Sequence, residues 1–311
     1  DKYADPEQGT GAVKITPAHD FNDYEVGVRN KLELLNVFTE DGKINIKAPK
    51  KYIGLDRFVA RKKILEDLSI KGLLVKEENI KNKIPYGDRS NSAIEPFLTE
   101  QWFVDAKKLA IKAKKIVKLK KTIFFPENWS KTYFQWMNNI EPWCISRQLW
   151  WGHQIPAWYG PDKKIFVANN ESEAKKNAKK YYKKEVELVR DSDVLDTWFS
   201  SGLWSFATLG WPNKNKYLNK FYPTSVLVTG FDIIFFWVAR MIMFGMEFMK
   251  KEPFRDIYVH ALVRDEKGQK MSKSKGNAID PLELIEIYSA DALRFTLLSM
   301  ASPGRDVKLS E

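Results

Sequence analysis

The chain has 311 residues, of which 44% are hydrophobic, so it can bury a core and form two domains or one domain with insertions. Its net charge of +11 suits a polyanionic partner, although a lysine-rich composition gives the same balance without one. A single cysteine, Cys144, excludes an internal disulfide and a cysteine-cluster zinc site, and the three histidines lie far apart in the sequence. We therefore expect no protein-bound metal and a reducing, cytoplasmic setting.

The first thirty residues predict a short strand and then a helix. Residues 12–16 follow a glycine turn and have the pattern of a strand, and Asp20 or Asn22 is placed to cap the helix that follows. A polar cluster surrounds this junction: Lys14, His19, Asp20 and Asp23. A carboxylate such as Asp23 is able to bind an ammonium group there, but helix capping plus surface charge is the simpler interpretation.

The next hundred residues alternate apolar runs with turns. In chain order we expect a turn, a helix, a turn-rich domain boundary and an apolar strand: residues 40–43, 56–71, 84–90 and 96–104. A helix over 107–121 then carries eight lysines around an imperfect apolar stripe. We interpret its charged face as solvated, with contact to backbone phosphates as the alternative.

Tryptophans recur every seven residues in the middle of the chain: Trp129, Trp136, Trp143 and Trp150. Pro142 and Gly152 exclude one continuous helix, so we expect one helix over 131–139, a second over 146–150, and most of these indoles in the core. Residues 161–190 are a lysine-rich insertion with a charged helix starting near Ser172.

Two later strands indicate a parallel α/β sheet. Residues 226–230 are an apolar strand that ends in glycine, Asp232 opens the next helix, and residues 256–263 form the following strand. Ligands of such sheets bind at the carboxyl ends of the strands. The apolar run around these elements is not expected to span a membrane, because Asp232, Arg240 and Glu247 interrupt it.

A lysine loop follows the second strand: Lys270-Met271-Ser272-Lys273-Ser274, between Gly268 and Gly276. Two flexible ammonium groups can reach an anion with several oxygens, such as a triphosphate, while a solvated turn is the simpler interpretation. Asp280 and Pro281 predict a helix immediately afterwards, and Ser289 caps a last helix.

Several separate stretches resemble one family. Residues 143–153, residues 193–202 and the lysine loop look like the catalytic core of class I aminoacyl-tRNA synthetases, and residues 9–27 resemble the end of that family's editing domain. Within the class the chain resembles the valyl branch, because Thr229 and Ile233 stand where the isoleucyl relative carries Glu and Gln.

The resemblance implies a Rossmann-type parallel-sheet α/β catalytic domain, represented by its second half, after the remnant of a β-rich editing domain. The implied divisions are 1–88 (editing), 89–135 (connective), 136–268 (catalytic, with the 161–190 insertion) and 269–311 (signature loop and stem-contact helices). It also implies ATP-dependent activation of valine, with Mg²⁺ accompanying the nucleotide, transfer to tRNA(Val), and hydrolytic editing of mischarged threonyl-tRNA.

Residue roles follow from the same resemblance. Lys270 and Lys273 would hold the ATP phosphates within the loop that Met271, Ser272 and Ser274 complete, and His260 and Asn277 would lie near the nucleotide. The valine side chain would contact Trp143, Trp237 and Ile233. The mischarged ester would be surrounded by Lys14, Asp20 and Asp23, with Asp23 binding the ammonium group.

The family's His-x-Gly-His signature does not occur in the 311 residues. We therefore expect an internal fragment, inactive alone and monomeric. Two alternatives remain open: an isoleucyl- or leucyl-specific synthetase fragment, and a non-catalytic basic module that binds RNA.

Overall fold

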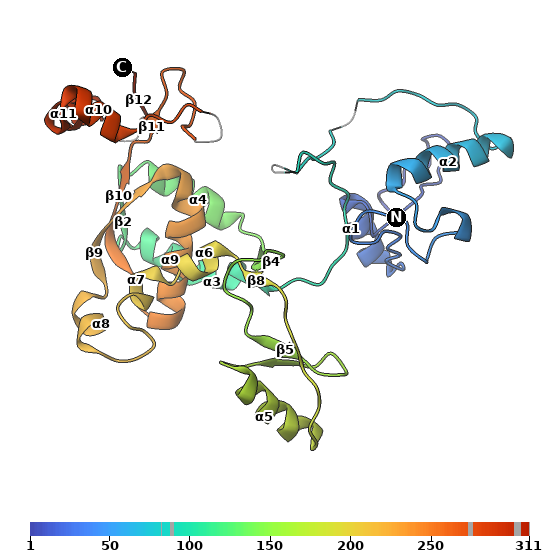
Figure 1. Cartoon of the computed structure of the whole chain (residues 1–311), viewed down its shortest axis with the longest axis horizontal. Coiled ribbons are helices and arrows are strands. Elements are labelled where there is room, and N and C mark those ends of the chain that lie inside the picture. The colour runs from blue at the N-terminus through green and yellow to red at the C-terminus, as the bar shows by residue number, and fades with distance from the viewer. Residues whose placement is uncertain (82, 88–89, 273–275, 302–305, 311) are drawn as a thin grey trace. The chain divides into compact units, whose positions relative to one another are not determined.

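The structure of the chain, a computed structural model, describes residues 1–81, 83–87, 90–272, 276–301 and 306–310. The chain divides into two compact units, Asp1–Glu100 (unit 1) and Gln101–Glu311 (unit 2) (Figure 1). The assignment of segments to editing, connective and catalytic domains stays a prediction.

The described residues of unit 1 contain three helical segments: α1 (Phe21–Asn30), the 3₁₀ turn η1 (Lys50–Tyr52) and α2 (Arg57–Ile70). Both predicted α-helices are present, and each is capped by an aspartate: Asp20, one of the two predicted candidates, and Asp56. The Asp20 carboxylate accepts hydrogen bonds from the backbone N–H groups of Asn22 and Asp23, and Asp56 accepts one from Phe58. These bonds satisfy N–H groups that have no partner inside the helix.

The strand predicted over residues 12–16 is wrong. In the described part of the chain this segment pairs with no strand, because Thr16 donates its backbone N–H and its hydroxyl to the Asp23 carboxylate instead. The turn predicted at 40–43 is confirmed, and it is flanked by the bridge between Phe38 and Ile44. Strand pairing in the described residues of unit 1 is limited to such isolated bridges.

Unit 2 is built on a parallel sheet, as predicted. Its strand order is β2 (Ile123–Phe125), β10 (Phe254–His260), β9 (Thr224–Gly230). Ile257 lies beside Phe124 on one side and Leu227 on the other, and all three side chains are buried. One face of the sheet therefore forms a wall of the core.

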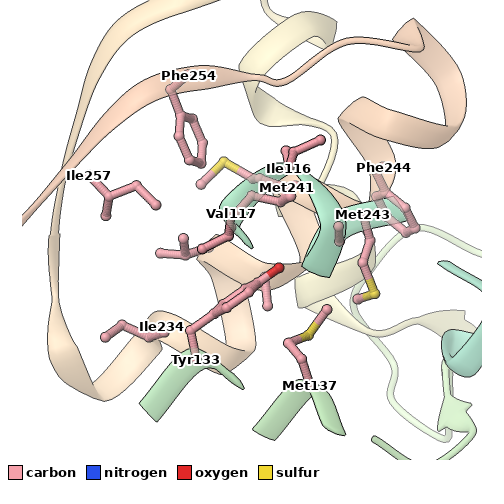
Figure 2. Packing of buried hydrophobic residues seen from close by; sticks show 14 of the residues in the cluster. Ile116, Val117, Tyr133, Met137, Ile234, Met241, Met243, Phe244, Phe254 and Ile257 are labelled. Atoms are coloured by element: carbon pink, nitrogen blue, oxygen red, sulfur yellow. The ribbon is translucent and has the colours of Figure 1, made fainter. Parts of the chain in front are cut away.

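Helices cover this face: α3 (Ala106–Lys118), α4 (Trp129–Asn138), and a continuous irregular stretch made of η2 (Phe231–Ile233), η3 (Ile234–Val238), α9 (Ala239–Phe244) and η4 (Gly245–Met249). Figure 2 shows Tyr133 and Met137 meeting Met241 and Met243 in the core, with Phe254 from the sheet nearby. Helix α3 contributes small alanines toward α9, so the two helices pack closely. The lysines of α3 lie mainly on its exposed face, so the choice between a solvated face and contact with backbone phosphates stays open.

Short antiparallel pairs surround the core: β1 (Phe103–Val104) with β3 (Trp143–Cys144), and β4 (Ser146–Arg147) with β8 (Val194–Leu195). The helix predicted over 146–150 is therefore wrong, because pairing with β8 overrides the local pattern. The strand predicted over 96–104 is reduced to the two residues of β1. Three short helices follow β8: α6 (Thr197–Ser201), α7 (Trp204–Ala207) and α8 (Lys216–Phe221).

The heptad tryptophans are not mostly core residues, which corrects the prediction. Trp143 is 8% exposed, whereas Trp136 is 51% exposed and Trp150 is fully exposed. The regular spacing spans a helix, a strand and a loop, so it does not place the four indoles on one face.

The insertion forms a small lobe around the predicted charged helix. It contains β5 (Ala157–Tyr159), β6 (Ile165–Val167), α5 (Glu171–Tyr182) and β7 (Val189–Arg190), with strand order β6-β5-β7. Trp158 and Ala174 lie in its separate hydrophobic cluster. The lysines of α5 therefore decorate a folded element.

The C-terminal part holds β11 (Val263–Arg264), α10 (Pro281–Tyr288), α11 (Ala290–Met300) and β12 (Val307–Lys308), with β11 and β12 parallel. Both helices begin at their predicted caps, Asp280 and Ser289. None of the helices in the described residues has the length and apolar character needed to cross a bilayer.

Candidate active site

The lysine loop begins as a tight hairpin after β11. Arg264 bridges Lys270, and the Asp265 backbone and carboxylate both bond to Gln269 across the turn. Gly268 has a φ of +77°, a conformation that glycine adopts without strain. The hairpin thereby fixes where the Lys270 side chain starts.

Asn277 holds the two sides of this loop together. Its Oδ1 accepts the Ser272 backbone N–H at 2.9 Å, and its Nδ2 donates to Asp265 Oδ2 at 2.9 Å and to the Lys270 carbonyl at 3.3 Å. The Asn277 amide is the main cause that lowers the pKa of Asp265, with the Gln269 N–H adding to it. Asn277, expected beside the nucleotide, thus has an internal bracing position in the structure.

The Lys270 ammonium group lies at the carboxyl end of the parallel sheet. Its Nζ is 3.4 Å from Asp232 Oδ2, and the Lys270 side chain is 74% exposed. Asp232 follows the last residue of β9, Gly230, which pairs in register with His260 at the end of β10. An anion that approaches this edge therefore meets a mobile, accessible cation.

A Cβ at Gly230 would lie 2.7 Å from Asp232 Oδ1, so a larger residue there would displace the Asp232 carboxylate. His260 is exposed, and its Nδ1 lies 2.7 Å from the Ala261 carbonyl oxygen. Met271 and Ser272 are half-buried. The other two residues of the predicted loop site, Lys273 and Ser274, lie outside the described residues.

The three residues predicted to contact valine occupy different environments. Trp143 is buried, and its ring lies near Phe199 and Phe244. Trp237 is half-buried and donates its indole N–H to the Ser201 carbonyl. Ile233 is half-buried beside Asp232. Trp143 thus lies in strand β3 and Trp237 in the helical stretch η3, and of the three only Ile233 is next in sequence to the residue that pairs with Lys270.

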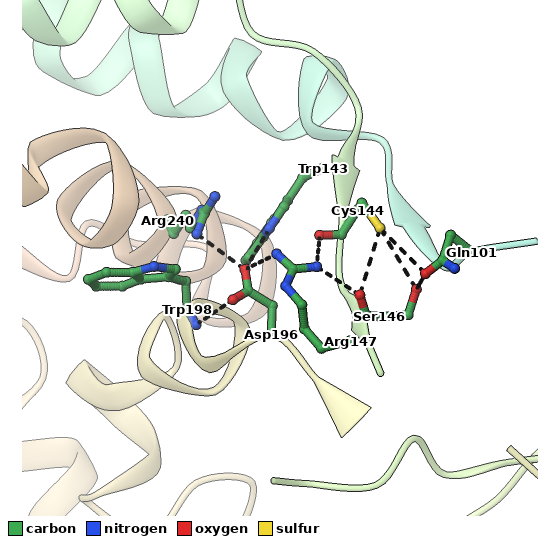
Figure 3. Close-up of polar contacts among 8 residues, drawn as sticks. All are labelled: Gln101, Trp143, Cys144, Ser146, Arg147, Asp196, Trp198 and Arg240. Atoms are coloured by element: carbon green, nitrogen blue, oxygen red, sulfur yellow. Dashed lines mark hydrogen bonds and ion pairs between the residues drawn. The ribbon is translucent and has the colours of Figure 1, made fainter. Parts of the chain in front are cut away.

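A buried charged cluster, which the sequence reasoning missed, surrounds Trp143 (Figure 3). Asp196 accepts the Trp143 indole N–H at 2.9 Å and forms ion pairs with Arg147 at 3.3 Å and Arg240 at 3.5 Å. The centre of the Arg240 guanidinium lies 3.8 Å from the Trp143 ring centroid, a cation–π distance. Burial lowers the pKa of Arg240 to about 10, with Asp196 opposing and Arg147 adding to the effect.

A second polar cluster connects the insertion to the rest of unit 2. Asp191 accepts hydrogen bonds from the Trp102 indole at 2.8 Å and from the Tyr159 hydroxyl at 2.6 Å. Burial, together with this bond, raises the pKa of Tyr159 to about 12. Both acidic residues, Asp191 and Asp196, lie within or beside the quoted motif of residues 193–202, but the sequence did not indicate their partners.

The predicted editing residues come together in unit 1. Asp23 is 5% exposed, and its Oδ2 accepts two bonds from Thr16 and lies 3.8 Å from Lys14 Nζ. Asp20 caps the helix that carries Asp23. Among the described residues, no group of three or more His, Cys, Asp or Glu side chains is arranged so that it could hold a metal ion.

Comparison with known proteins identifies the family. Residues 15–310 match the family model described as tRNA synthetases class I (I, L, M and V), and the chain therefore belongs to this family. Its similarity is to valine--tRNA ligases: it is 81% identical over its whole length to that of Pelagibacter ubique (strain HTCC1062) and 58% identical to that of Caulobacter vibrioides. It covers 36% and 34% of these proteins, so it spans about a third of the length of the curated relatives it matches.

A solved structure supports the fold. The chain is similar to the structure titled Mycobacterium tuberculosis methionyl-tRNA synthetase in complex with methionyl-adenylate, with a TM-score of 0.53 and a sequence identity of 20%. The match covers 73% of the present chain and 39% of the methionyl-tRNA synthetase chain. The predicted synthetase family and the parallel-sheet α/β class are both confirmed.

Proposed function

We propose that the chain is part of an enzyme that activates valine with ATP and transfers it to tRNA(Val). The observation that carries this proposal is the position of Lys270, an exposed ammonium group beside Asp232 at the carboxyl ends of β9 and β10. This is the edge of a parallel sheet where ligands bind. The 81% identity to a valine--tRNA ligase supplies the choice of amino acid and of tRNA.

In the proposed reaction an oxygen of the valine carboxylate bonds to the α-phosphorus of ATP. The bond from that phosphorus to the bridging oxygen breaks, and pyrophosphate leaves with the electron pair. A terminal ribose hydroxyl of the tRNA then attacks the valyl carbonyl, and AMP leaves. These steps need positioning and charge neutralisation rather than a side-chain nucleophile.

Lys270 and Lys273 are proposed to neutralise charge that develops on the departing phosphates, with His260 close to the nucleotide. The structure supports the Lys270 assignment through its exposure and its weak ion pair with Asp232, the one ion pair of Lys270 within the described residues, which a phosphate can replace. The Asp265–Asn277 contact keeps the hairpin in shape. Mg²⁺ would accompany the phosphates, whose oxygens it prefers.

The proposed valine contacts remain Trp143, Trp237 and Ile233. Anchoring of Trp143 by Asp196 and Arg240 supports a rigid wall, because an indole with a fixed N–H bond cannot rotate freely. Both partners are buried, so the wall is set by the fold itself.

Pyrophosphate exchange by a full-length protein tests the proposal. Valine should support exchange far better than isoleucine or leucine, and Lys270→Ala should lower kcat more than it changes the KM for valine. Lys267→Ala is a matched control, because Lys267 is an exposed lysine of the same hairpin. Equal losses from the two variants, or binding of RNA without any exchange, would contradict the proposal. We expect little exchange from the 311-residue chain alone, which spans a third of its relatives' length.

We also propose that Lys14, Asp20 and Asp23 belong to a site that hydrolyses mischarged threonyl-tRNA. Threonine is isosteric with valine, and a hydrophobic pocket rejects it only about a hundredfold, a value known for valyl-tRNA synthetases generally and not worked out from this structure. Thr16 and Lys14 surround Asp23 Oδ2, which leaves Oδ1 to receive the ammonium group of the ester. Asp23→Ala in the full-length protein should leave threonyl-tRNA(Val) intact, and undiminished deacylation would rule the site out.

A further inference from the structure

A concave surface lined by several cations lies at the opposite end of the sheet from Lys270. A pocket of about 470 Å³ opens where the chain enters β2, β9 and β10. We call it the amino-edge pocket, and it is lined by residues that include Lys120, Lys121, Ser225, Lys251, Glu252 and Arg255. Because the three strands are parallel, their amino ends share one edge, and the pocket is separate from the candidate active site.

The lining is dominated by positive charge. Four cationic side chains face one carboxylate, Glu252. Two of the cations have a nearby acid: Lys120 lies 3.7 Å from Glu127, and Arg255 lies 3.1 Å from Asp256. In the part of the chain that the structure describes, Lys121 and Lys251 form no ion pair, so two ammonium groups are left to attract an anion.

The positions of Lys121 and Lys251 are not explained by an interaction with the dipole of a neighbouring helix. Cations favour helix C-termini, and α3 already carries Lys115 and Lys118 in its last turn. Lys121 comes three residues after the end of α3, beyond the range of that effect. Lys250, not Lys251, is the residue that ends η4.

The chemistry of the pocket selects phosphate. Ammonium groups on flexible stems act as point charges for phosphate oxygens, and the Ser225 side chain offers a hydroxyl in the same wall. The volume exceeds that of a single phosphate, and the cations come from two connections and from β10, so they are spread around the pocket. The ligand is therefore a molecule with more than one phosphate.

We propose that the amino-edge pocket binds a phosphate-bearing polyanion, either the backbone of an RNA strand or a free polyphosphate. The inference does not depend on the proposed synthetase activity, because it uses none of the residues assigned to that reaction.

The test compares Lys121→Ala/Lys251→Ala with Lys176→Ala/Lys180→Ala in the 311-residue chain. The control pair lies exposed on α5 and removes the same charge. Binding of a single-stranded RNA 12-mer and of tripolyphosphate is measured by titration, with circular dichroism to check that each variant is folded. Lys270→Ala is included so that tripolyphosphate bound at the other edge is recognised.

If RNA is the ligand, the Lys121/Lys251 variant should bind the 12-mer about tenfold more weakly than the control. The slope of log affinity against log salt should also fall by about 1.4, at about 0.7 for each contact to a single strand. If only tripolyphosphate binding weakens, the ligand is a free polyphosphate. Binding of both ligands within twofold of the control would overturn the proposal.

A second measurement avoids substitutions. The bound RNA 12-mer or tripolyphosphate should protect Lys121 and Lys251 from chemical acetylation more than it protects Lys176 and Lys180. Mass spectrometry measures the extent of acetylation at each lysine. Equal protection of the two pairs would also overturn the proposal.

Discussion

Replacement of Asp196 by asparagine should destabilise unit 2 more than any single surface substitution. The change keeps the shape of the side chain, but an amide has only one acceptor oxygen. Trp143 donates to Oδ2 and the Trp198 backbone N–H donates to Oδ1, so asparagine keeps only one of these two bonds. It also removes the negative charge that faces Arg147 and Arg240. Comparison with a background that lacks Arg240 separates the cost of the unpaired cation from that of the lost bond.

The magnitude follows from how well each arginine can reach water. The Arg147 side chain is 39% exposed and can turn outward, whereas that of Arg240 is 8% exposed and cannot. Removal of one partner from a buried pair costs about 3–5 kcal/mol. We expect Asp196→Asn to lower the free energy of unfolding by about 3 kcal/mol, because the cation–π contact between Arg240 and Trp143 remains.

Urea unfolding followed by tryptophan fluorescence measures this effect in unit 2 alone, because all 11 tryptophans lie between residues 102 and 237. With a slope of about 2 kcal/mol per molar urea, the midpoint should fall by about 1.5 M. In an Arg240→Met background the same Asp196→Asn change should cost under about 1 kcal/mol. An equal cost in both backgrounds would show that the Asp196–Arg240 charge pair is not the cause.

Three further predictions concern the loop, the insertion and the core. Asn277→Ala in a full-length protein should lower kcat for pyrophosphate exchange about tenfold, with little change in the KM for valine. The substitution removes three hydrogen bonds that shape the hairpin carrying Lys270. An unchanged kcat would refute this prediction. Burial alone would raise the pKa of Asp191, but bonds from Tyr159 and Trp102 outweigh it and hold that pKa below its usual value. The unfolded chain then binds more protons near pH 4, so the stability lost in Asp191→Asn should be largest above about pH 4 and shrink in acid, as urea titrations at pH 7 and pH 3 can show. Phe254→Ala should cost about 3–5 kcal/mol in the same assay because the ring is 1% exposed, and a loss under about 1 kcal/mol would contradict its core position.

Features that depend on neighbouring residues could be predicted from the sequence. Asp20, one of the two candidates for its helix, and Asp280 and Ser289 cap helices where expected, because a cap needs only its own side chain and the next two or three N–H groups. Two of the three strands of the parallel sheet, β9 and β10, were predicted for a similar reason, since continuous apolar runs with glycine or polar ends mark them, whereas the short strand β2 was not predicted.

Features set by distant partners could not be predicted. Ser146 and Arg147 form a strand only because β8, far along the chain, pairs with them. Asp196 and Arg240 are 44 positions apart, and no local pattern links a helix cap to a buried arginine. The approach of Lys270 to Asp232 is an intermediate case, because parallel topology brings strand ends to one edge without specifying which side chains meet there.

The Asp196 cluster and the Lys270 site, both in unit 2, differ in exposure in a way that suits their proposed roles. Asp196 is shielded from water and contacts three side chains, so loss of a partner removes a hydrogen bond or ion pair that water cannot readily replace. Lys270 is exposed and has one carboxylate 3.4 Å away, so water or a phosphate can replace Asp232 at little cost. A group that must bind a phosphate and then release it needs such a replaceable partner, whereas a wall that discriminates between similar side chains must not move. The lysine loop lies at the sheet edge and the Asp196 cluster is buried, so the exposed site can exchange its partner while the buried one holds its side chains in place.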